Sequence, residues 1–234
     1  MKVLSLFDGI SCGYEALLRA WVPVDEYYAS EIDKHAIKVA MDNHPDIVQI
    51  GDVCQVKGED YKDIDLIIWG SPCQWFSMAG KMLNFSDPRS KLFFEFVRLV
   101  KECKPKYFLL ENVKMKKDYI KVITEQLWGV EPTLIDSALV SAQHRNRLYW
   151  VGKLQEDWTY AKVEIPQPED RWILLKDILL EYVEPKYELT DSQKKNYERD
   201  FGSKGKVLPE WAEKCPTLTA SMGTWWWNIP AILE

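Results

Sequence analysis

The chain has 234 residues and is 47% hydrophobic, which is enough for one α/β domain with a full core and a small appendage. Its formal net charge of −6 counts only mildly against a nucleic-acid partner, because a local basic face is enough to bind phosphates. Five widely spaced cysteines without a CxxC pair argue against a zinc cage or a disulfide framework, and we expect no metal.

Strand-like and helix-like segments alternate along the first half of the chain. The β-branched or aromatic runs are VLSLF (3–7), EYYASE (26–31), DLIIW (65–69) and YFLLEN (107–112). Helical spacing occupies residues 14–20, 34–43 and 90–101. This alternation predicts a mostly parallel α/β sheet with crossover helices, and ligands then bind at the carboxyl ends of its strands.

The pattern of strand-like and helix-like segments changes towards the C-terminal third. Residues 135–152 are typical of two further strands joined by a polar turn, whereas prolines punctuate the chain beyond 153 and helical spacing returns only near 172–182. We therefore predict one domain over 1–152 and a small irregular region over 153–234. No apolar run of about 18 residues and no signal-peptide layout occurs, so we expect a cytoplasmic protein with no membrane partner.

Three strand ends carry residues suited to a nucleoside ligand. The first run ends in FDGISCG (7–13), where glycines at a strand-to-helix turn let a ligand approach the backbone. Glu31 follows about 20 residues later and can accept a ribose hydroxyl. Asp52, after Gly51, can receive an exocyclic amine. Either acid alone can be a surface residue, but the ordered set favours a nucleoside cofactor, and the poor match to GxGxxG disfavours a dinucleotide.

Cys73 stands in a polar turn, GSPCQ (70–74), directly after an apolar run. A lone cysteine is usually a buried structural residue. Its place at the carboxyl end of a strand, with Pro72 fixing the backbone before it, favours a chemical role instead.

Four short motifs occur in a fixed order: SLFDGISCG (5–13), SPCQ (71–74), ENV (111–113) and QHRNR (143–147), with CPTLTA (215–220) further on. In this order they resemble the motifs of the DNA (cytosine-5)-methyltransferases of prokaryotic or phage type. The resemblance implies a doubly wound, Rossmann-like fold that binds S-adenosylmethionine. It also implies that 153–234 holds part of a target-recognition region and the start of the family's C-terminal motifs.

The resemblance assigns the chemistry to three side chains. Cys73 is the thiolate that adds to carbon-6 of a flipped-out cytosine, which lets carbon-5 attack a methyl sulfonium. Glu111 relieves the charge that develops at ring nitrogen 3, and Arg145 lies near the cysteine and the base. Expected cofactor contacts are Phe7, Asp8, Gly9, Gly13, Glu31, Ile32, Asp52, Val53 and Pro72. Expected nucleic-acid contacts are Gln74, Ser77, Arg89, Gln143 and Arg147.

The expected partner is double-stranded DNA, bound by a monomer that works beside a restriction endonuclease of the same system. A candidate basic face for DNA comprises Lys114, Lys116, Lys117 and Lys121, with Arg145 and Arg147 further on, although a solvated helix face explains the lysine run as well. Three alternatives stay open: a catalytically impaired DNA-binding relative, an RNA cytosine-5 methyltransferase, and an unrelated cysteine hydrolase that would use His144. The recognised base sequence cannot be read from the chain.

The chain departs from the family pattern in two ways. It holds 11 Trp and only 11 Gly, and several tryptophans stand where relatives commonly show glycine. These are Trp21, Trp69, Trp75, Trp172 and Trp225–Trp227. Our hypothesis is a gene that encodes glycine by UGA and has been translated with UGA as tryptophan; the alternative is a genuine Trp-rich variant. Secondly, the family continues beyond CPTLTA, so we expect a reading frame truncated at its C-terminus.

Overall fold

The computed structural model describes residues 1–70, 88–182, 184–188, 190–192, 207–209, 213–217 and 231–233. The chain divides into two compact units. The first comprises Met1–Leu134 and Arg147–Pro166, and the second comprises Ile135–Asn146 and Gln167–Glu234. The cuts fall within β6 (Thr133–Asp136), within β7 (Asn146–Leu154) and after Pro166. The domain boundary after residue 152 stays a prediction. The roles predicted for the two regions stay predictions.

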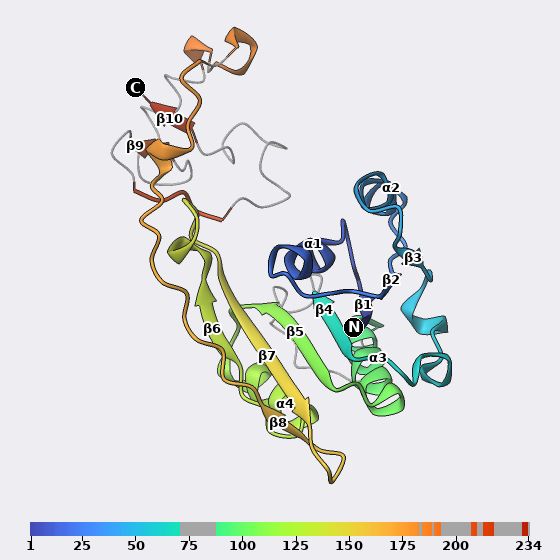
Figure 1. Cartoon of the computed structure of the whole chain (residues 1–234). Helices are drawn as coiled ribbons and strands as arrows, with labels where there is room; N and C mark the ends of the chain where they lie inside the picture. The colour runs from blue at the N-terminus through green and yellow to red at the C-terminus, as the bar shows by residue number, and fades with distance from the viewer. Residues whose placement is uncertain are drawn as a thin grey trace. The chain divides into compact units, whose positions relative to one another are not determined.

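A mostly parallel sheet forms the centre of the first unit (Figure 1). Its strand order is β3-β2-β1-β4-β5-β7-β6, with β8 paired to β7. The strands are β1 (Lys2–Leu6), β2 (Glu26–Ser30), β3 (Val48–Gln49), β4 (Leu66–Gly70), β5 (Tyr107–Val113), β6 (Thr133–Asp136), β7 (Asn146–Leu154) and β8 (Tyr160–Lys162). The pairs among β1 to β5 are parallel, whereas β7 runs antiparallel to both β5 and β8. The predicted α/β sheet is confirmed.

Helices cover both faces of this sheet, because its strands alternate their side chains between two cores. The helices are α1 (Cys12–Arg19), α2 (Lys34–Asn43), α3 (Pro88–Cys103) and α4 (Lys117–Gln126). On one face Leu6 and Trp69 pack in the core cluster that includes Phe96 of α3. On the other face Val3 packs in a smaller cluster with Tyr14 of α1. Burial on both faces explains the apolar strand runs and confirms the doubly wound fold.

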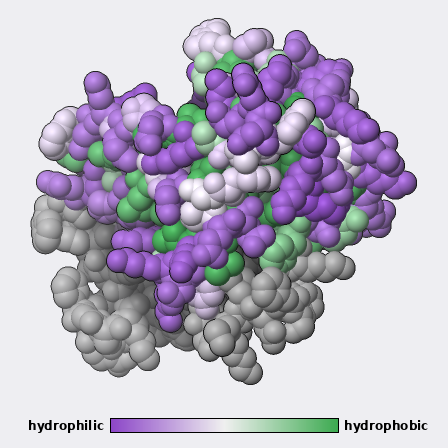
Figure 2. Space-filling view, turned by 90° about the horizontal axis from the view of Figure 1, so that it is seen from below, coloured by the Kyte–Doolittle hydropathy of each residue, from purple (hydrophilic) through white to green (hydrophobic). Residues whose placement is uncertain are grey.

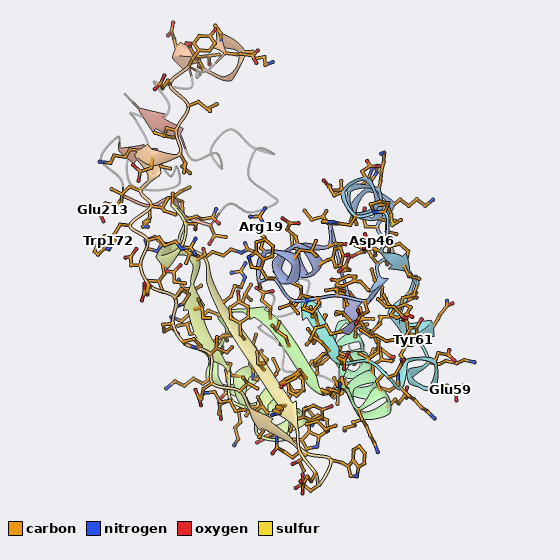
Figure 3. All side chains as sticks on the ribbon, in the orientation of Figure 1. Arg19, Asp46, Glu59, Tyr61, Trp172 and Glu213 are labelled. Atoms are coloured by element: carbon orange, nitrogen blue, oxygen red, sulfur yellow. The ribbon has the colours of Figure 1, made fainter. Side chains whose placement is uncertain are left out.

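A partly buried polar contact anchors α1 beside the sheet. Tyr14 donates a hydrogen bond to the Asp46 carboxylate, which is labelled in Figure 3. This hydrogen bond, with burial adding to it, raises the pKa of Tyr14 to about 12. The phenol therefore keeps its proton and its donor role at any physiological pH.

The region beyond the sheet is irregular, as expected, but its predicted helix is absent. Within 172–182 the structure has only a 3₁₀ turn, η5 (Leu175–Asp177). Leu180 and Tyr182 are exposed there, so the apolar residues form no one-sided stripe that a helix could bury. A second 3₁₀ turn, η6 (Pro185–Tyr187), follows, and β9 (Val207–Pro209) pairs in parallel with β10 (Ala231–Leu233).

The visible surface is mostly hydrophilic, with small apolar patches between polar side chains (Figure 2). Among the described residues, no helix has the length and apolar character needed to span a membrane.

Candidate active site

The topology of the sheet predicts where a ligand would bind. β1 pairs with β2 on one side and with β4 on the other, so the connections after β1 and β4 diverge at the carboxyl edge of the sheet. Open α/β sheets bind ligands at such a switch point. The loops after β1, β2 and β3 and the end of β5 all reach this edge, because these strands are parallel.

The loop after β1 adopts an unusual backbone that its side chains hold in place. Phe7, Gly9 and Ser11 have φ values of 55°, 59° and 64°. The Asp8 carboxylate accepts hydrogen bonds from the Ser11 hydroxyl and, at 2.7 Å, from the Tyr27 hydroxyl. Burial, reinforced by Asp8, raises the pKa of Tyr27, which keeps this donor protonated. A Cβ at Gly9 would have no heavy atom within 4 Å, so the loop leaves open space there.

Glu31 ties the first two loops together. One carboxylate oxygen, Oε2, accepts the N–H of Gly9 at 2.8 Å, and Oε1 accepts those of Ile32 and Asp33 at 2.8 and 2.9 Å. A carboxylate has about four acceptor positions, so three backbone bonds leave about one for a ligand hydroxyl. The Ile32 side chain beside it is 74% exposed.

The third loop places an acid at the same edge. Gly51 has a φ of 77°, and its carbonyl accepts a hydrogen bond from the Ser30 hydroxyl at 2.7 Å. Asp52 caps η1 (Val53–Gln55) through a 2.9 Å bond from the Cys54 N–H to its Oδ1. Val53 is only 4% exposed and belongs to the core, so a cofactor contact by its side chain stays a prediction that burial disfavours.

Glu111 lies at the end of β5 and forms an ion pair that the sequence did not reveal. Glu111 is in register with Gly70, the last described residue before the cysteine motif. On the other side, Arg147 of β7 is in register with Val113, which makes it the diagonal neighbour of Glu111 on one face of the sheet. Arg147 Nε lies 2.7 Å from Glu111 Oε1, with side chains 10% and 25% exposed. The pair therefore works largely shielded from water.

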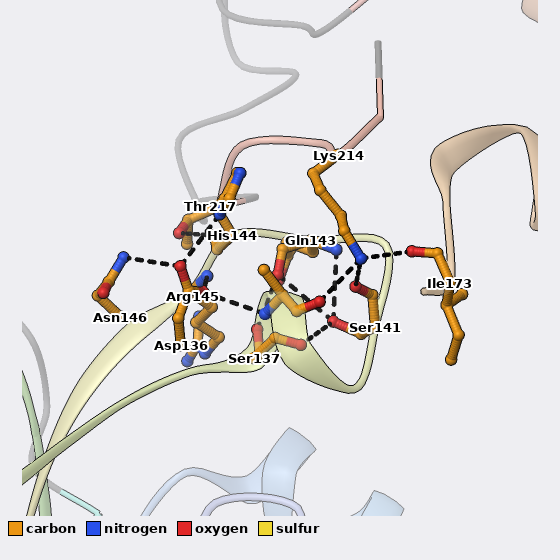
Figure 4. A network of polar contacts seen from close by, with 11 residues as sticks. Asp136, Ser137, Ser141, Gln143, His144, Arg145, Asn146, Ile173, Lys214 and Thr217 are labelled. Atoms are coloured by element: carbon orange, nitrogen blue, oxygen red, sulfur yellow. Dashed lines mark hydrogen bonds and ion pairs between the residues drawn. The ribbon is translucent and has the colours of Figure 1, made fainter. Parts of the chain in front are cut away.

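The arginine motif forms a polar network in the second unit (Figure 4). The Asp136 carboxylate accepts hydrogen bonds from the N–H groups of Ala138 at 3.1 Å and Arg145 at 2.8 Å. Its other oxygen lies 3.0 Å from His144 Nδ1 and 3.2 Å from Asn146 Nδ2. Burial opposes ionisation of Asp136, but the hydrogen bonds outweigh it and lower its pKa. The backbone of Arg145 is thus fixed by a charged acceptor.

Residues 213–217 close this network from the far end of the chain. Lys214 Nζ donates to the carbonyls of Ala138, Ser141 and Ile173 at 2.8, 3.1 and 2.6 Å (Figure 4). The Cys215 N–H donates to the Ala142 carbonyl at 2.7 Å, and the Thr217 hydroxyl donates to the His144 carbonyl at 2.6 Å. The start of the CPTLTA motif therefore pairs with the arginine motif. Sequence reasoning found both motifs but missed Lys214 and Asp136, whose only signal was their place beside them.

Several predicted residues cannot be placed. Pro72, Cys73, Gln74 and Ser77 lie outside the described residues, as does the side chain of Arg89, whose backbone is in α3. The roles of these residues, and that of Gln143, whose carbonyl accepts a 2.9 Å bond from the Ser137 hydroxyl, stay predictions.

The four lysines of the predicted basic face are exposed where β5 leads into α4. Lys114, Lys116 and Lys117 follow the end of β5, and Lys121 lies on α4. They belong to the same unit as Glu111 and follow it directly in the chain. Their contact with DNA stays a prediction.

Comparison with known proteins agrees with the motif order. The family model described as C-5 cytosine-specific DNA methylase matches residues 1–218. The Type II methyltransferase M1.ScrFI of Lactococcus lactis subsp. cremoris is 36% identical over 202 residues, which cover 81% of this chain and 51% of that protein. The Type II methyltransferase M.NlaX of Neisseria lactamica is 34% identical over 211 residues, covering 85% and 66%.

Solved structures share the fold at lower identity. The S. pombe Dnmt2 methyltransferase has a TM-score of 0.72 at 20% identity and covers 99% of this chain and 76% of that chain. A Spodoptera frugiperda DNMT2 mutant has a TM-score of 0.70 at 20% identity, covering 94% and 70%. The chain spans about half the length of several curated relatives that it matches. On the match over residues 1–218, the chain belongs to the C-5 cytosine-specific DNA methylase family.

Proposed function

We propose that the protein transfers a methyl group from S-adenosylmethionine to carbon-5 of cytosine in double-stranded DNA, through a covalent adduct of Cys73 with a flipped-out base. The observation that carries this proposal is the largely shielded Glu111–Arg147 pair at the end of β5. Glu111 is in register with Gly70, and the three residues that follow Gly70, ending at Cys73, can span about 11 Å at most. An acid and a nucleophile within reach of one base are what cytosine methylation requires.

The three loops at the carboxyl edge fit the cofactor. The remaining acceptor position of Glu31 suits a ribose hydroxyl, and the exposed Ile32 offers an apolar surface to the adenine ring. Asp52 can accept the exocyclic amine, and the open space at Gly9 admits the methionine part close to the backbone. When bound, S-adenosylmethionine supplies an electrophilic methyl group on a sulfonium.

The base is activated by addition and restored by elimination. The Cys73 thiolate forms a bond to carbon-6, and the electron pair displaced from the 5,6 double bond is shared by carbon-5 and ring nitrogen 3. With the donor bound, carbon-5 would form a bond to the methyl carbon, and the sulfonium would be left as a neutral thioether when its bond to that carbon breaks. Carbon-5 then loses its proton to a proton acceptor and the thiolate leaves carbon-6. The 5,6 double bond is restored and the cysteine is regenerated.

Glu111 acts at ring nitrogen 3 and the neighbouring exocyclic amine. The carboxylate accepts a hydrogen bond from the amine, and a proton held between the carboxyl group and nitrogen 3 relieves the charge that addition creates. Arg147 positions this carboxyl group through the 2.7 Å ion pair.

DNA binding is proposed for the lysines after β5. Lys114, Lys116 and Lys117 are exposed, and each can bind a phosphate on the strand that carries the target base. The target base must leave the duplex to be reached, which costs a few kcal/mol. A monomer working with a restriction endonuclease stays a prediction.

The proposal is tested by methyl transfer from labelled S-adenosylmethionine to duplex DNA and, in a parallel arm, to RNA. We expect label in DNA cytosine, and none with Cys73→Ser. Cys103→Ser is the matched control, because burial raises the pKa of that thiol to about 12 and leaves it a poor nucleophile. A duplex with 5-fluorocytosine should trap the wild-type protein covalently. Label in RNA alone, or trapping that survives Cys73→Ser, would overturn the proposal.

A further inference from the structure

Four of the six tryptophans in the described part of the chain have a left-handed backbone. Their φ values are 56° at Trp21, 55° at Trp128, 65° at Trp158 and 55° at Trp172. The other non-glycine residues with positive φ are Phe7, Ser11 and Lys104. This region is uncommon for any L-residue and least tolerable for a bulky one, whereas glycine enters it freely. Tryptophan is thus concentrated where it fits worst.

Trp21 stands at the glycine position of a helix terminus. After α1, the Trp21 N–H donates to the Leu18 carbonyl and the Val22 N–H donates to the Leu17 carbonyl, both at 3.0 Å. These two bonds define a Schellman motif, whose left-handed residue is usually glycine. The Trp21 side chain is 91% exposed, so packing offsets little of the backbone strain.

Trp128 occupies the equivalent position after α4. The Gly129 N–H donates to the Thr124 carbonyl at 2.9 Å. Of the two bonds of a Schellman motif, this is the one that spans more residues. Gly129 itself has a φ of 81°, so two successive residues are left-handed. Here the ring packs on Tyr160, with centroids 4.9 Å apart, which offsets part of the strain.

Two further tryptophans occupy turns. Between β7 and β8 the Trp158 N–H donates to the Gln155 carbonyl at 3.1 Å, which closes a turn. Trp158, the last residue of that turn, has a left-handed backbone, and hairpins of this kind favour glycine at such a position. In the second unit the Trp172 N–H donates to Asp170 Oδ1 at 2.8 Å, and its side chain, labelled in Figure 3, is 75% exposed. Four tryptophans thus meet the same backbone demand at two helix ends and two separate turns.

We propose that the polypeptide made in its native host carries glycine at positions 21, 128, 158 and 172, encoded by UGA. UGA and the tryptophan codon UGG differ in the third base alone, so reading UGA as tryptophan gives the printed sequence from such a gene. The backbone argument does not extend to Trp69 and Trp150. Both lie in strands, have no positive φ and are fully buried in the core.

The coding sequence gives the first test. UGA is expected at positions 21, 128, 158 and 172, and tryptic peptides of the native protein should show the residue mass of glycine there. UGG codons, or peptides that contain tryptophan, would overturn the proposal. The same reading decides Trp75 and Trp225–Trp227, which lie outside the described residues.

Stability gives a second test that does not depend on the gene. Trp21→Gly and Trp172→Gly are compared with Trp21→Ala and Trp172→Ala, because alanine removes the ring but keeps the Cβ that strains the backbone. Each glycine variant should favour the folded state about 5- to 30-fold more than its alanine partner in denaturant titrations. Trp150→Gly, at an extended core position, should lose stability relative to Trp150→Ala. Glycine variants no more stable than their alanine partners would refute the backbone argument.

Discussion

The ion pair between Glu111 and Arg147 can be measured by neutralising each partner alone and both together. The charged atoms lie 2.7 Å apart, and the side chains are 25% and 10% exposed. Exposed pairs contribute about 0.2–1 kcal/mol, whereas removal of one partner of a buried pair costs about 3–5 kcal/mol because it leaves a charge uncompensated. This pair lies nearer the buried class. Glu111→Gln and Arg147→Gln should therefore each lower the free energy of unfolding by about 3 kcal/mol.

The double variant should be less destabilised than the sum of the two single variants, with a coupling energy of about 1.5–3 kcal/mol by urea titration. Lys121 and Glu125 provide the matched control, since they form a pair at 3.8 Å with side chains 77% and 59% exposed. Neutralising that pair should show little coupling. A coupling below about 0.5 kcal/mol between Glu111 and Arg147 would refute the account of a shielded pair. Methyl transfer should be lost in both variants that replace Glu111, the single and the double.

Three further predictions concern charge. Lys214→Met removes three charge-assisted hydrogen bonds and should lower the free energy of unfolding by about 2–4 kcal/mol, while exposed Lys121→Met should not; equal melting temperatures would contradict this. The lowered pKa of Asp136 means that its charge stabilises the folded state above about pH 4, and that this contribution is lost as the pH falls through the folded-state value. Asp136→Asn should then flatten the acid unfolding curve below pH about 4, and an unchanged curve would count against the network. Combined Lys116→Ala and Lys117→Ala should reduce the slope of log affinity for DNA against log salt by about 1.8, and an unaltered slope would exclude both from phosphate contact.

The strands and most helices could be predicted because the pattern of buried apolar residues within each segment identifies its type. DLIIW (65–69) and EYYASE (26–31) match β4 and β2 within one residue at each end, since strands buried on both faces are continuous apolar runs. Helical spacing over 34–43 matches α2 in full. The sequence indicates α4 only as one interpretation of the lysine run. This helix buries only Ile123 and Thr124, so its apolar residues form a weak periodic pattern. The short β8 gave no signal, because three residues are too few for a periodic pattern.

Some residues of the candidate site could likewise be predicted from the sequence, whereas others could not. Glu31 and Asp52 follow strand ends, and the parallel order of β1, β2 and β3 brings them to one edge without further information. The partnership of Glu111 with Arg147 depends on the register of β5 with β7, which the sequence does not state. Lys214 reaches the carbonyls of Ala138 and Ser141, just before the arginine motif, across 76 and 73 residues, beyond the reach of any local pattern. Asp136 lies only 8 to 10 residues from its partners in that motif, but those hydrogen bonds depend on the turn between β6 and β7.

The position of β7 has a practical consequence for recombinant fragments. β5 receives its second neighbour only from residues 146–154, although that neighbour runs antiparallel and comes late in the chain. A polypeptide ending before residue 146 would present the unpaired edge of a central apolar strand to other copies, which invites aggregation during translation and expression. Shortened versions intended for crystallisation should therefore retain β7 in full.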